Sequence, residues 1–319
     1  MNQGWKKLLT PRVVELLAQA HGALGEVSML GRVWEEWKAF VRGPLVCRAA
    51  VRAKPCGGVG TRLVELLALG PSPRPSRPPR ALRRAVGVVW AWDEVWGVKG
   101  EVLPDMVARI VSALKAEELK RFYRPRPGPV IPEGAEVWTL ASRWRQAGVP
   151  GLVAVGLALG LWEKRGGGGS EGECAGWVLA AALAKALGME AEGLVLWNEA
   201  RGEAAQGGWV EGFVAGAWRS AGATARLGAE AMRLYREHQQ LVRTWVRAPA
   251  NPLKLLRLLV GRGVVSRPVI SEELGVTQRT AGLCVAKLEE LGLIKEITGQ
   301  RRGRLYAYMP LLELLGGGD

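Results

Sequence analysis

Histidine and cysteine are scarce in this chain of 319 residues, and their scarcity excludes several kinds of site. The two histidines, His21 and His238, lie far apart in the sequence, and none of the four cysteines forms a Cys-x-x-Cys pair. Protein zinc sites are built mainly from these two residue types at short spacings. We therefore expect no metal site and no bound cofactor, and we expect free thiols in a reducing cytosol.

Long hydrophobic runs are also lacking. The longest apolar run, residues 147–162, is short and rich in glycine, so we expect it to form a buried helix rather than a membrane span. The N-terminal stretch MNQGWKKLLTPR leads directly into an amphipathic helical pattern and has no signal-peptide organisation. These features predict a cytoplasmic protein that does not contact a membrane.

A nucleotide-binding signature is absent as well. No G-x-x-x-x-G-K-[ST] sequence occurs, and the glycine-rich stretch 166–169 is followed by Ser170, Glu171 and Glu173 rather than by lysine. Glycines let backbone N–H groups converge on an anion, but without the lysine we expect a flexible loop at 166–172. The two glutamates are expected to be solvated rather than to hold Mg²⁺.

Positive charge is abundant, and the net charge of +14 is unevenly distributed. Residues 1–125 hold 21 basic and 11 acidic side chains, whereas residues 251–319 hold 10 and 7. A basic N-terminal surface would attract nucleic acid without regard to its sequence. An arginine-rich, GC-biased genome explains the same excess, and both explanations stay open. The excess of Arg over Lys and the 14 tryptophans also fit a thermophilic source.

Apolar residues recur at helical spacing through most of the first 250 residues. No convincing strand pattern precedes Ala250, so we expect a helical bundle there. Trp90, Trp92 and Trp96 stand in an apolar run, and we expect them to pack in the core rather than to stack on bases. Helices are predicted over residues 11–53, 61–69, 81–96, 104–122, 136–148, 151–164, 174–187 and 207–246.

The composition divides the chain into four parts. A helical segment at 1–69 is followed by a proline-rich linker at 70–80, GPSPRPSRPPR, and by a helical domain at 81–250. The last part, 251–319, combines helical and strand patterns. The fold class is therefore mainly α, a helical bundle followed by a small α+β domain.

The last part has the pattern of a winged helix-turn-helix. Asn251 is the predicted N-cap of a first helix, with Pro252 at its first position, and glycines at 261 and 263 end that helix. A second helix is predicted from Ser266 to Leu274, Gly275 makes the turn, and Thr277 caps a third helix that ends near Leu291 and Gly292. Two strand patterns follow, LIKEIT and LYAYM, and the basic GQRRGR lies between them as a hairpin tip.

The third helix of this module has two chemically distinct sides. Ala281, Val285, Leu288 and Leu291 share one side and should pack inward, whereas Gly282 and the polar residues face outward. The N-terminus of such a helix enters the major groove, where Gln and Arg can bind adenine and guanine, and arginines on the wing suit phosphates or the minor groove. The predicted partner is double-stranded DNA, and a protein-docking module is the alternative. The predicted DNA contacts are Thr277, Gln278, Arg279, Thr280, Lys287, Arg301, Arg302 and Arg304.

Several segments together resemble Fic-type proteins that carry a winged helix after a helical Fic domain. The segments that carry the resemblance are GWVEGFVAGAWRSAGATARLGAEAMRLYREHQQLVRTWV, KEITGQRRGRLYAY, LLAQAHGALGEV and EVWGVKGEVLPDMV. The resemblance implies that residues 81–250 form a Fic-like helical domain. Plasmid-borne helix-turn-helix proteins with a degraded Fic-like body are a closer likeness.

The chain departs from the family at the position of its catalytic motif. Active Fic enzymes resemble H-P-F-x-[DE]-G-N-G-R, in which the histidine is the base and the acid holds Mg²⁺. Here the slot contains WEKRGGGGSEGECAGW, residues 162–177, and an ungapped match places Arg165 at the histidine position. Arginine stays protonated and cannot act as a base at neutral pH. The inhibitory glutamate is similarly replaced, at about Lys99, so the resemblance implies no catalytic residues.

The sequence therefore predicts a sequence-specific DNA-binding protein, a transcriptional regulator whose helical body no longer catalyses a reaction and is expected to dimerise or to bind a partner. A plasmid replication initiator or another DNA-binding protein of a mobile element is one alternative. A Fic-type nucleotidyltransferase that moves AMP to a protein hydroxyl is another, and the missing histidine argues against it.

Overall fold

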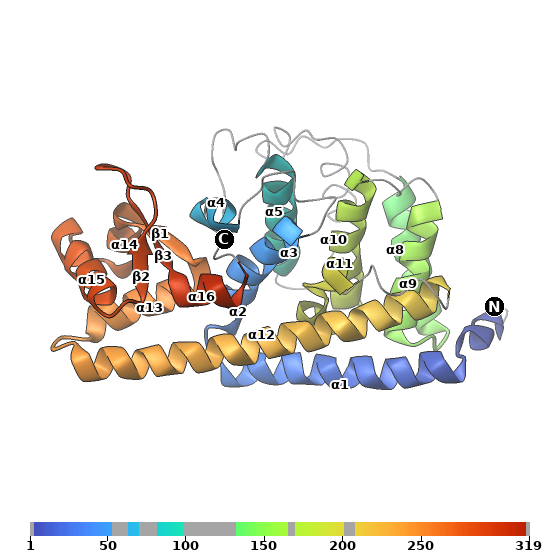
Figure 1. Cartoon of the computed structure of the whole chain (residues 1–319). Coiled ribbons are helices and arrows are strands. Elements are labelled where there is room, and N and C mark those ends of the chain that lie inside the picture. The colour runs from blue at the N-terminus through green and yellow to red at the C-terminus, as the bar shows by residue number, and fades with distance from the viewer. Residues whose placement is uncertain are drawn as a thin grey trace.

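Two long helices lie side by side along one edge of the molecule in the computed structural model (Figure 1). The structure describes residues 3–52, 63–69, 82–97, 132–164, 170–200 and 208–316. The helices α1 (Pro11–Val33) and α12 (Trp209–Trp245) run in the same direction. With 37 residues, α12 extends for about 55 Å. It reaches from the helical body to the C-terminal module and so connects the two.

The remaining described elements of the helical body follow in chain order. They are η1 (Gln3–Leu8), α2 (Trp37–Phe40), the π-helical turn η2 (Val41–Leu45), α3 (Val46–Arg52), α4 (Leu63–Ala68), α5 (Arg83–Gly97), α8 (Pro132–Gln146), α9 (Gly151–Trp162), α10 (Ser170–Ala186), η5 (Ala191–Leu194) and α11 (Trp197–Ala200).

Local chemistry explains where α1 begins and which side it buries. Thr10 caps the helix, because its side-chain oxygen accepts a hydrogen bond from the backbone N–H of Val13 at 3.2 Å. Pro11 occupies the first turn, where its missing N–H is not needed. The apolar side of α1 lies against α12, and small residues of α12 allow close approach: a Cβ on Gly228 would lie 2.7 Å from the Leu30 side chain.

The core of the body surrounds α9. This helix is apolar on all sides and packs between α8, α10 and α12. Gly156 and Gly160 let α12 come close, since an added Cβ would meet Phe213 and Trp209 at 2.9 and 2.7 Å. The prediction that this helix is buried is confirmed.

The C-terminal module contains every strand of the described structure. Strand β3 is central and pairs antiparallel with both β1 and β2, so that Val265 lies opposite Tyr306 and Lys295 opposite Ala307. The elements are α13 (Ala250–Arg262), β1 (Val264–Ser266), α14 (Arg267–Leu274), α15 (Gln278–Glu290), β2 (Ile294–Glu296), β3 (Leu305–Tyr308) and α16 (Met309–Leu314). The predicted fold class, mainly α with a small α+β module at the C-terminus, is confirmed.

Close backbone packing fixes the module to the body. Helix α13 lies against α2 and η2. A Cβ on Gly43 would lie 2.1 Å from the carbonyl oxygen of Gly261, and a Cβ on Gly261 would lie 2.8 Å from the Cβ atom of Ala39. Contacts this short exclude any side chain at Gly43 unless one of the two helices moves. Main-chain atoms of η2 and α13 therefore set how closely these two elements can approach.

Polar contacts add to this junction. His238 of α12 places Nδ1 2.6 Å from the hydroxyl of Tyr308 in β3, and Arg48 donates from Nε to the carbonyl oxygen of Leu315 at 3.1 Å. Burial lowers the pKa of His238, which favours the neutral ring. His238 is half-buried and joins α12 to β3.

Several predicted boundaries need correction. Helix α13 starts at Ala250, one residue before Asn251, and its N-cap is Pro249. Helix α8 starts at Pro132, four residues before the predicted helix 136–148, and α10 starts at Ser170, inside the predicted loop 166–172. The strand β1 and the helix α16 were not predicted. The predicted helix 104–122 and the linker 70–80 lie outside the described residues.

The cysteines are not all free thiols. Cys47 and Cys284 are free, as expected, and both are buried, but Cys174 is disulfide-bonded, so the prediction of free thiols is wrong for this residue. Sequence spacing gave no sign of this bond, because it depends on which segments meet in space. Among the described residues, no helix combines enough length with enough apolar character to cross a membrane.

Candidate nucleic-acid interface

The turn between α14 and α15 is held by local hydrogen bonds. Gly275 adopts the left-handed conformation, with φ of +65°, and ends α14. Ser271 donates from its hydroxyl to the carbonyl oxygen of Val276. Thr277 then caps α15 by accepting the backbone N–H of Thr280 at 3.2 Å. These contacts fix the angle at which α15 leaves the turn, as a helix-turn-helix requires.

One side of α15 is anchored in the module. The opposite side of α15 faces solvent in the N-terminal half of the helix. Leu291 was predicted to pack inward but is only half-buried. Burial raises the pKa of Cys284, so its thiol stays protonated and acts as a small core side chain. The buried residues of this side are Ala281, Cys284, Val285 and Leu288.

The predicted DNA contacts on α15 differ in their exposure and in whether their side chains already have a partner within the protein. Gln278 and Arg279 are exposed in the first turn of the helix. The hydroxyl of Thr280 is tied to that of the capping Thr277 at 3.0 Å, and Thr280 is half-buried. Lys287 is exposed but forms an ion pair with Glu290 at 2.7 Å, which has little energetic value at the surface. Gln278 and Arg279 are thus the two predicted contacts on α15 that are best placed to reach a base edge.

The wing between β2 and β3 is shaped by one carboxylate. Glu296, the last residue of β2, accepts the backbone N–H groups of Thr298 and Gly299 at 2.7 and 3.0 Å. It also accepts the hydroxyl of Thr298. These hydrogen bonds lower the pKa of Glu296, and the one from the Thr298 hydroxyl has the largest effect. The carboxylate therefore stays charged and fixes the base of the hairpin.

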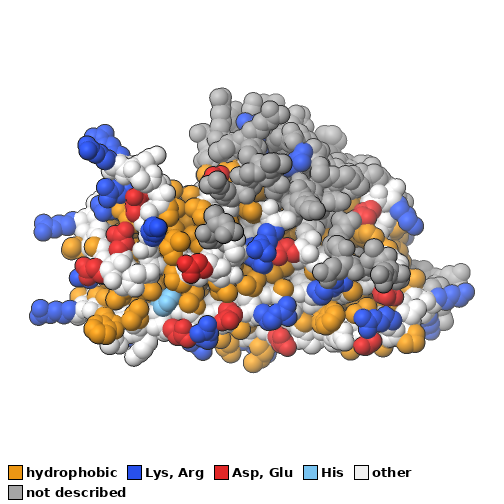
Figure 2. Space-filling model, in the orientation of Figure 1, with side chains coloured by type: hydrophobic (Ala, Val, Ile, Leu, Met, Phe, Trp, Pro, Cys, Tyr) orange, Lys and Arg blue, Asp and Glu red, His pale blue; other side chains and the backbone are white. Residues whose placement is uncertain are grey.

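The tip of the wing presents arginines to solvent. Arg301, Arg302 and Arg304 are all exposed, and Arg304 donates from Nε to the carbonyl oxygen of Gln300 at 2.9 Å. Figure 2 shows Lys and Arg side chains projecting over the hairpin and over the same end of the molecule that Figure 1 labels α15. The two groups of predicted contacts, on α15 and on the wing, therefore lie at the same end of the molecule.

Two further residues of this end were not predicted to contact DNA. Arg267, the first residue of α14, is exposed, and its guanidinium carbon would lie 3.9 Å from a Cβ on Gly282, so it runs beside α15. The same group lies 5.7 Å from the ring centroid of Tyr306. Leu283 has 60% of its surface exposed on the outer side of α15. The position of Arg267 follows from tertiary packing, which a helical pattern does not contain.

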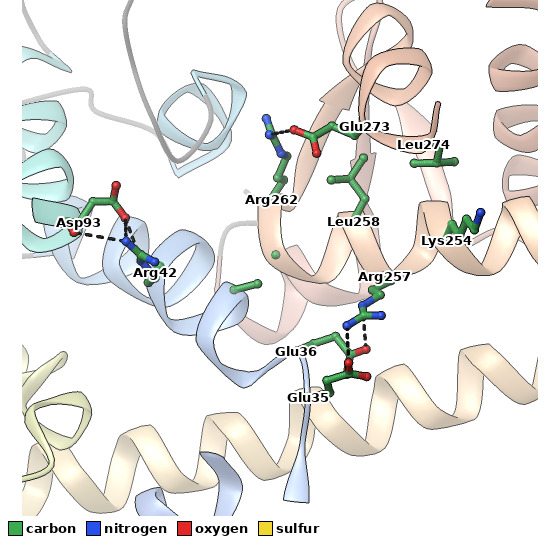
Figure 3. Close-up of a pocket in the computed structure, with 12 residues that line it drawn as sticks. Glu35, Glu36, Arg42, Asp93, Lys254, Arg257, Leu258, Arg262, Glu273 and Leu274 are labelled. Atoms are coloured by element: carbon green, nitrogen blue, oxygen red, sulfur yellow. Dashed lines mark hydrogen bonds and ion pairs between the residues drawn. The ribbon is translucent and has the colours of Figure 1, made fainter. Parts of the chain in front are cut away.

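A cavity of about 660 Å³ lies between the module and the body (Figure 3). Three arginines line it, and together they form four ion pairs. Arg42 contacts Asp93 at 2.6 Å, Arg257 contacts Glu35 and Glu36 at 3.0 and 3.2 Å, and Arg262 pairs with Glu273. Basic and acidic groups face one another here, so the lining has no excess of either sign. Of these pairs, only those of Arg257 join α13 to the body.

The region of the Fic-type motif is only partly described. Arg165, the glycines 166–169 and Lys99 lie outside the described residues. The side chains of Glu171 and Glu173 are also not described, so the predicted absence of a phosphate or Mg²⁺ site in this segment stays a prediction.

Comparison with known proteins agrees with the geometry of the C-terminal module. Residues 253–308 match a family model described as an HTH DNA-binding domain. A search of curated proteins finds no match to the chain. The matched residues cover α13, the helix-turn-helix of α14 and α15, and the sheet with its wing. The C-terminal module is therefore a helix-turn-helix DNA-binding domain, attached to a body that is built from helices.

Proposed function

We propose that this protein is a sequence-specific regulator of transcription that binds double-stranded DNA through α15 and the wing. The observation that carries the proposal is the position of Arg279 on the free side of α15, at the same end of the molecule as the wing arginines. A helix N-terminus that carries an exposed arginine can bind guanine in the major groove, while a basic hairpin holds the phosphate backbone.

Selection of bound DNA from a random pool with the full-length protein tests this proposal. We expect one enriched sequence, located in a promoter region and protected in footprinting at physiological salt. A replication initiator would instead enrich repeats found at an origin. A module that docks to protein would bind no DNA even at low salt, and that result would refute the proposal.

We also propose that the helical body is Fic-like but catalytically inactive. The support is chemical: the chain has no histidine between His21 and His238, so the slot of the Fic motif lacks a base. Incubation of the protein with α-labelled ATP and a cell lysate should give no labelled protein. Transfer of label would instead favour a nucleotidyltransferase.

Removal of the wing arginines should change the salt dependence of binding. We expect the combined change of Arg301, Arg302 and Arg304 to alanine to lower the slope of log K against log [salt] by up to about 2.7, since each phosphate contact contributes about 0.9. Fluorescence anisotropy from low to physiological salt measures this slope. The enriched sequence should stay the same, and an unchanged slope would show that the wing does not contact phosphates.

We further propose that two copies of the chain associate through the solvent-facing side of α1. Val14 and Val33 are each 51% exposed and Met29 is 54% exposed, which is high for large apolar side chains. A Cβ on Gly22 or Gly25, the two glycines at the centre of this side, would meet no atom within 4 Å. At helical spacing, the residues of this side are Val14, Ala18, Gly22, Gly25, Met29 and Val33.

This side of α1 is complementary to itself under a two-fold axis. In an antiparallel pair centred between Gly22 and Gly25, Gly22 of one copy faces Gly25 of the other. Ala18 then faces Met29 and Val14 faces Val33, so apolar or small side chains meet along the whole side. We expect the wild type to be dimeric by light scattering and Met29→Glu to be monomeric. Arg236→Ala on α12, which changes the charge by the same amount, is the control. A wild type that is monomeric at high concentration would refute the dimer.

A further inference from the structure

Leu283 stands out on the exposed side of the recognition helix. It is 60% exposed, although the other large apolar side chains of α15 are buried. It follows Arg279 by four residues, and residues four apart lie on the same side of a helix. Its neighbours Gly282 and Ala286 are small, so Leu283 is the apolar group that projects farthest from this side.

The major groove offers few partners for such a side chain. Base edges there present hydrogen-bond donors and acceptors, and the one apolar group is the C5-methyl of thymine. An alkyl side chain that enters the groove makes an unfavourable contact with the polar edges and a favourable one with that methyl group. Leu283 is therefore suited to discriminate thymine from the other three bases.

We propose that Leu283 contacts the C5-methyl of a thymine and makes this base part of the recognised sequence. The inference rests on the proposed DNA-binding function of α15. Four residues of helix rise by about 6 Å, and base pairs are spaced by about 3.4 Å. With α15 along the groove, the thymine lies about two base pairs from the guanine that Arg279 contacts.

Replacement of thymine by deoxyuridine tests the contact, because the two bases differ only in this methyl group. Each thymine of the selected site is replaced in turn, and affinity is measured with the full-length protein. We expect one position at which the wild type loses affinity by about fourfold, the effect of exposing one buried methyl group. Leu283→Ala should bind the two DNAs equally, and Leu283→Met, which keeps a long apolar side chain, should retain the preference.

The outcomes separate this inference from the function on which it rests. A wild type with a selected site but without sensitivity to deoxyuridine refutes the role of Leu283 and leaves sequence-specific binding intact. So does a Leu283→Ala variant that still prefers the thymine DNA over the deoxyuridine DNA by the same factor as the wild type. A wild type without any sequence preference refutes the proposed function itself. Because Leu283 is exposed, its variants should unfold at the same temperature as the wild type.

Discussion

Arg279→Ala is expected to weaken binding of the full-length protein to its selected site by about 1–3 kcal/mol, or roughly 5- to 150-fold. The side chain is exposed in the first turn of α15, and its helix is fixed by the Thr277 cap and by a buried opposite side. Its guanidinium can donate two hydrogen bonds to guanine, and alanine can donate none. Binding to random DNA should fall much less, because only one charge is lost there.

A matched variant separates the lost contact from the lost charge. Arg12→Ala also removes one arginine, but Arg12 lies at the start of α1, at the opposite end of the molecule, where it pairs with Glu15 at 2.8 Å. Its affinity for the selected site should equal that of the wild type. Competition titrations against specific and random DNA measure both variants at several salt concentrations. If Arg279→Ala loses affinity equally for both DNAs, Arg279 contacts phosphate and does not select a base.

The helix-turn-helix was predictable because its signals are local. A left-handed glycine at 275, a threonine cap at 277 and a helical pattern of apolar residues each act within a few positions of the chain. The hairpin was visible for the same reason, as two short strand patterns around GQRRGR. Strand β1 was missed because it has only three residues, and alternation cannot be recognised over so short a stretch.

The features that the sequence did not predict depend on contacts between distant residues. The position of Arg267 beside α15 and the bond of Cys174 arise from packing that no helical pattern contains. Leu283 is a different case. Its place on the outer side of α15 follows from the spacing of the buried residues, so the pattern held the signal. The exposed fraction that makes Leu283 a candidate for a DNA contact comes from the structure and not from the pattern.

The junction between the module and the body should be intolerant of even one added methyl group at Gly43. The nearest atom to a Cβ there is the backbone carbonyl oxygen of Gly261 at 2.1 Å, which cannot rotate away as a flexible side chain would. Either η2 or α13 must move, and both are packed among buried residues. We expect Gly43→Ala to lower the free energy of unfolding by about 1–3 kcal/mol, the range for overpacking of a core. Denaturant titration of the full-length protein measures the change.

Gly222→Ala is the matched control, because it adds the same methyl group to a helix at a position with room. A Cβ there would lie 3.4 Å from the tip of the flexible Arg226 side chain. Alanine has the higher helix propensity, so this variant should be as stable as the wild type or more stable by up to about 1 kcal/mol. Equal stability of Gly43→Ala and wild type would show that the junction can separate. In that case α13 would not be held rigidly against η2. A destabilised Gly43→Ala would instead show that the close backbone contact between η2 and α13 persists in solution and helps to hold the module against the body.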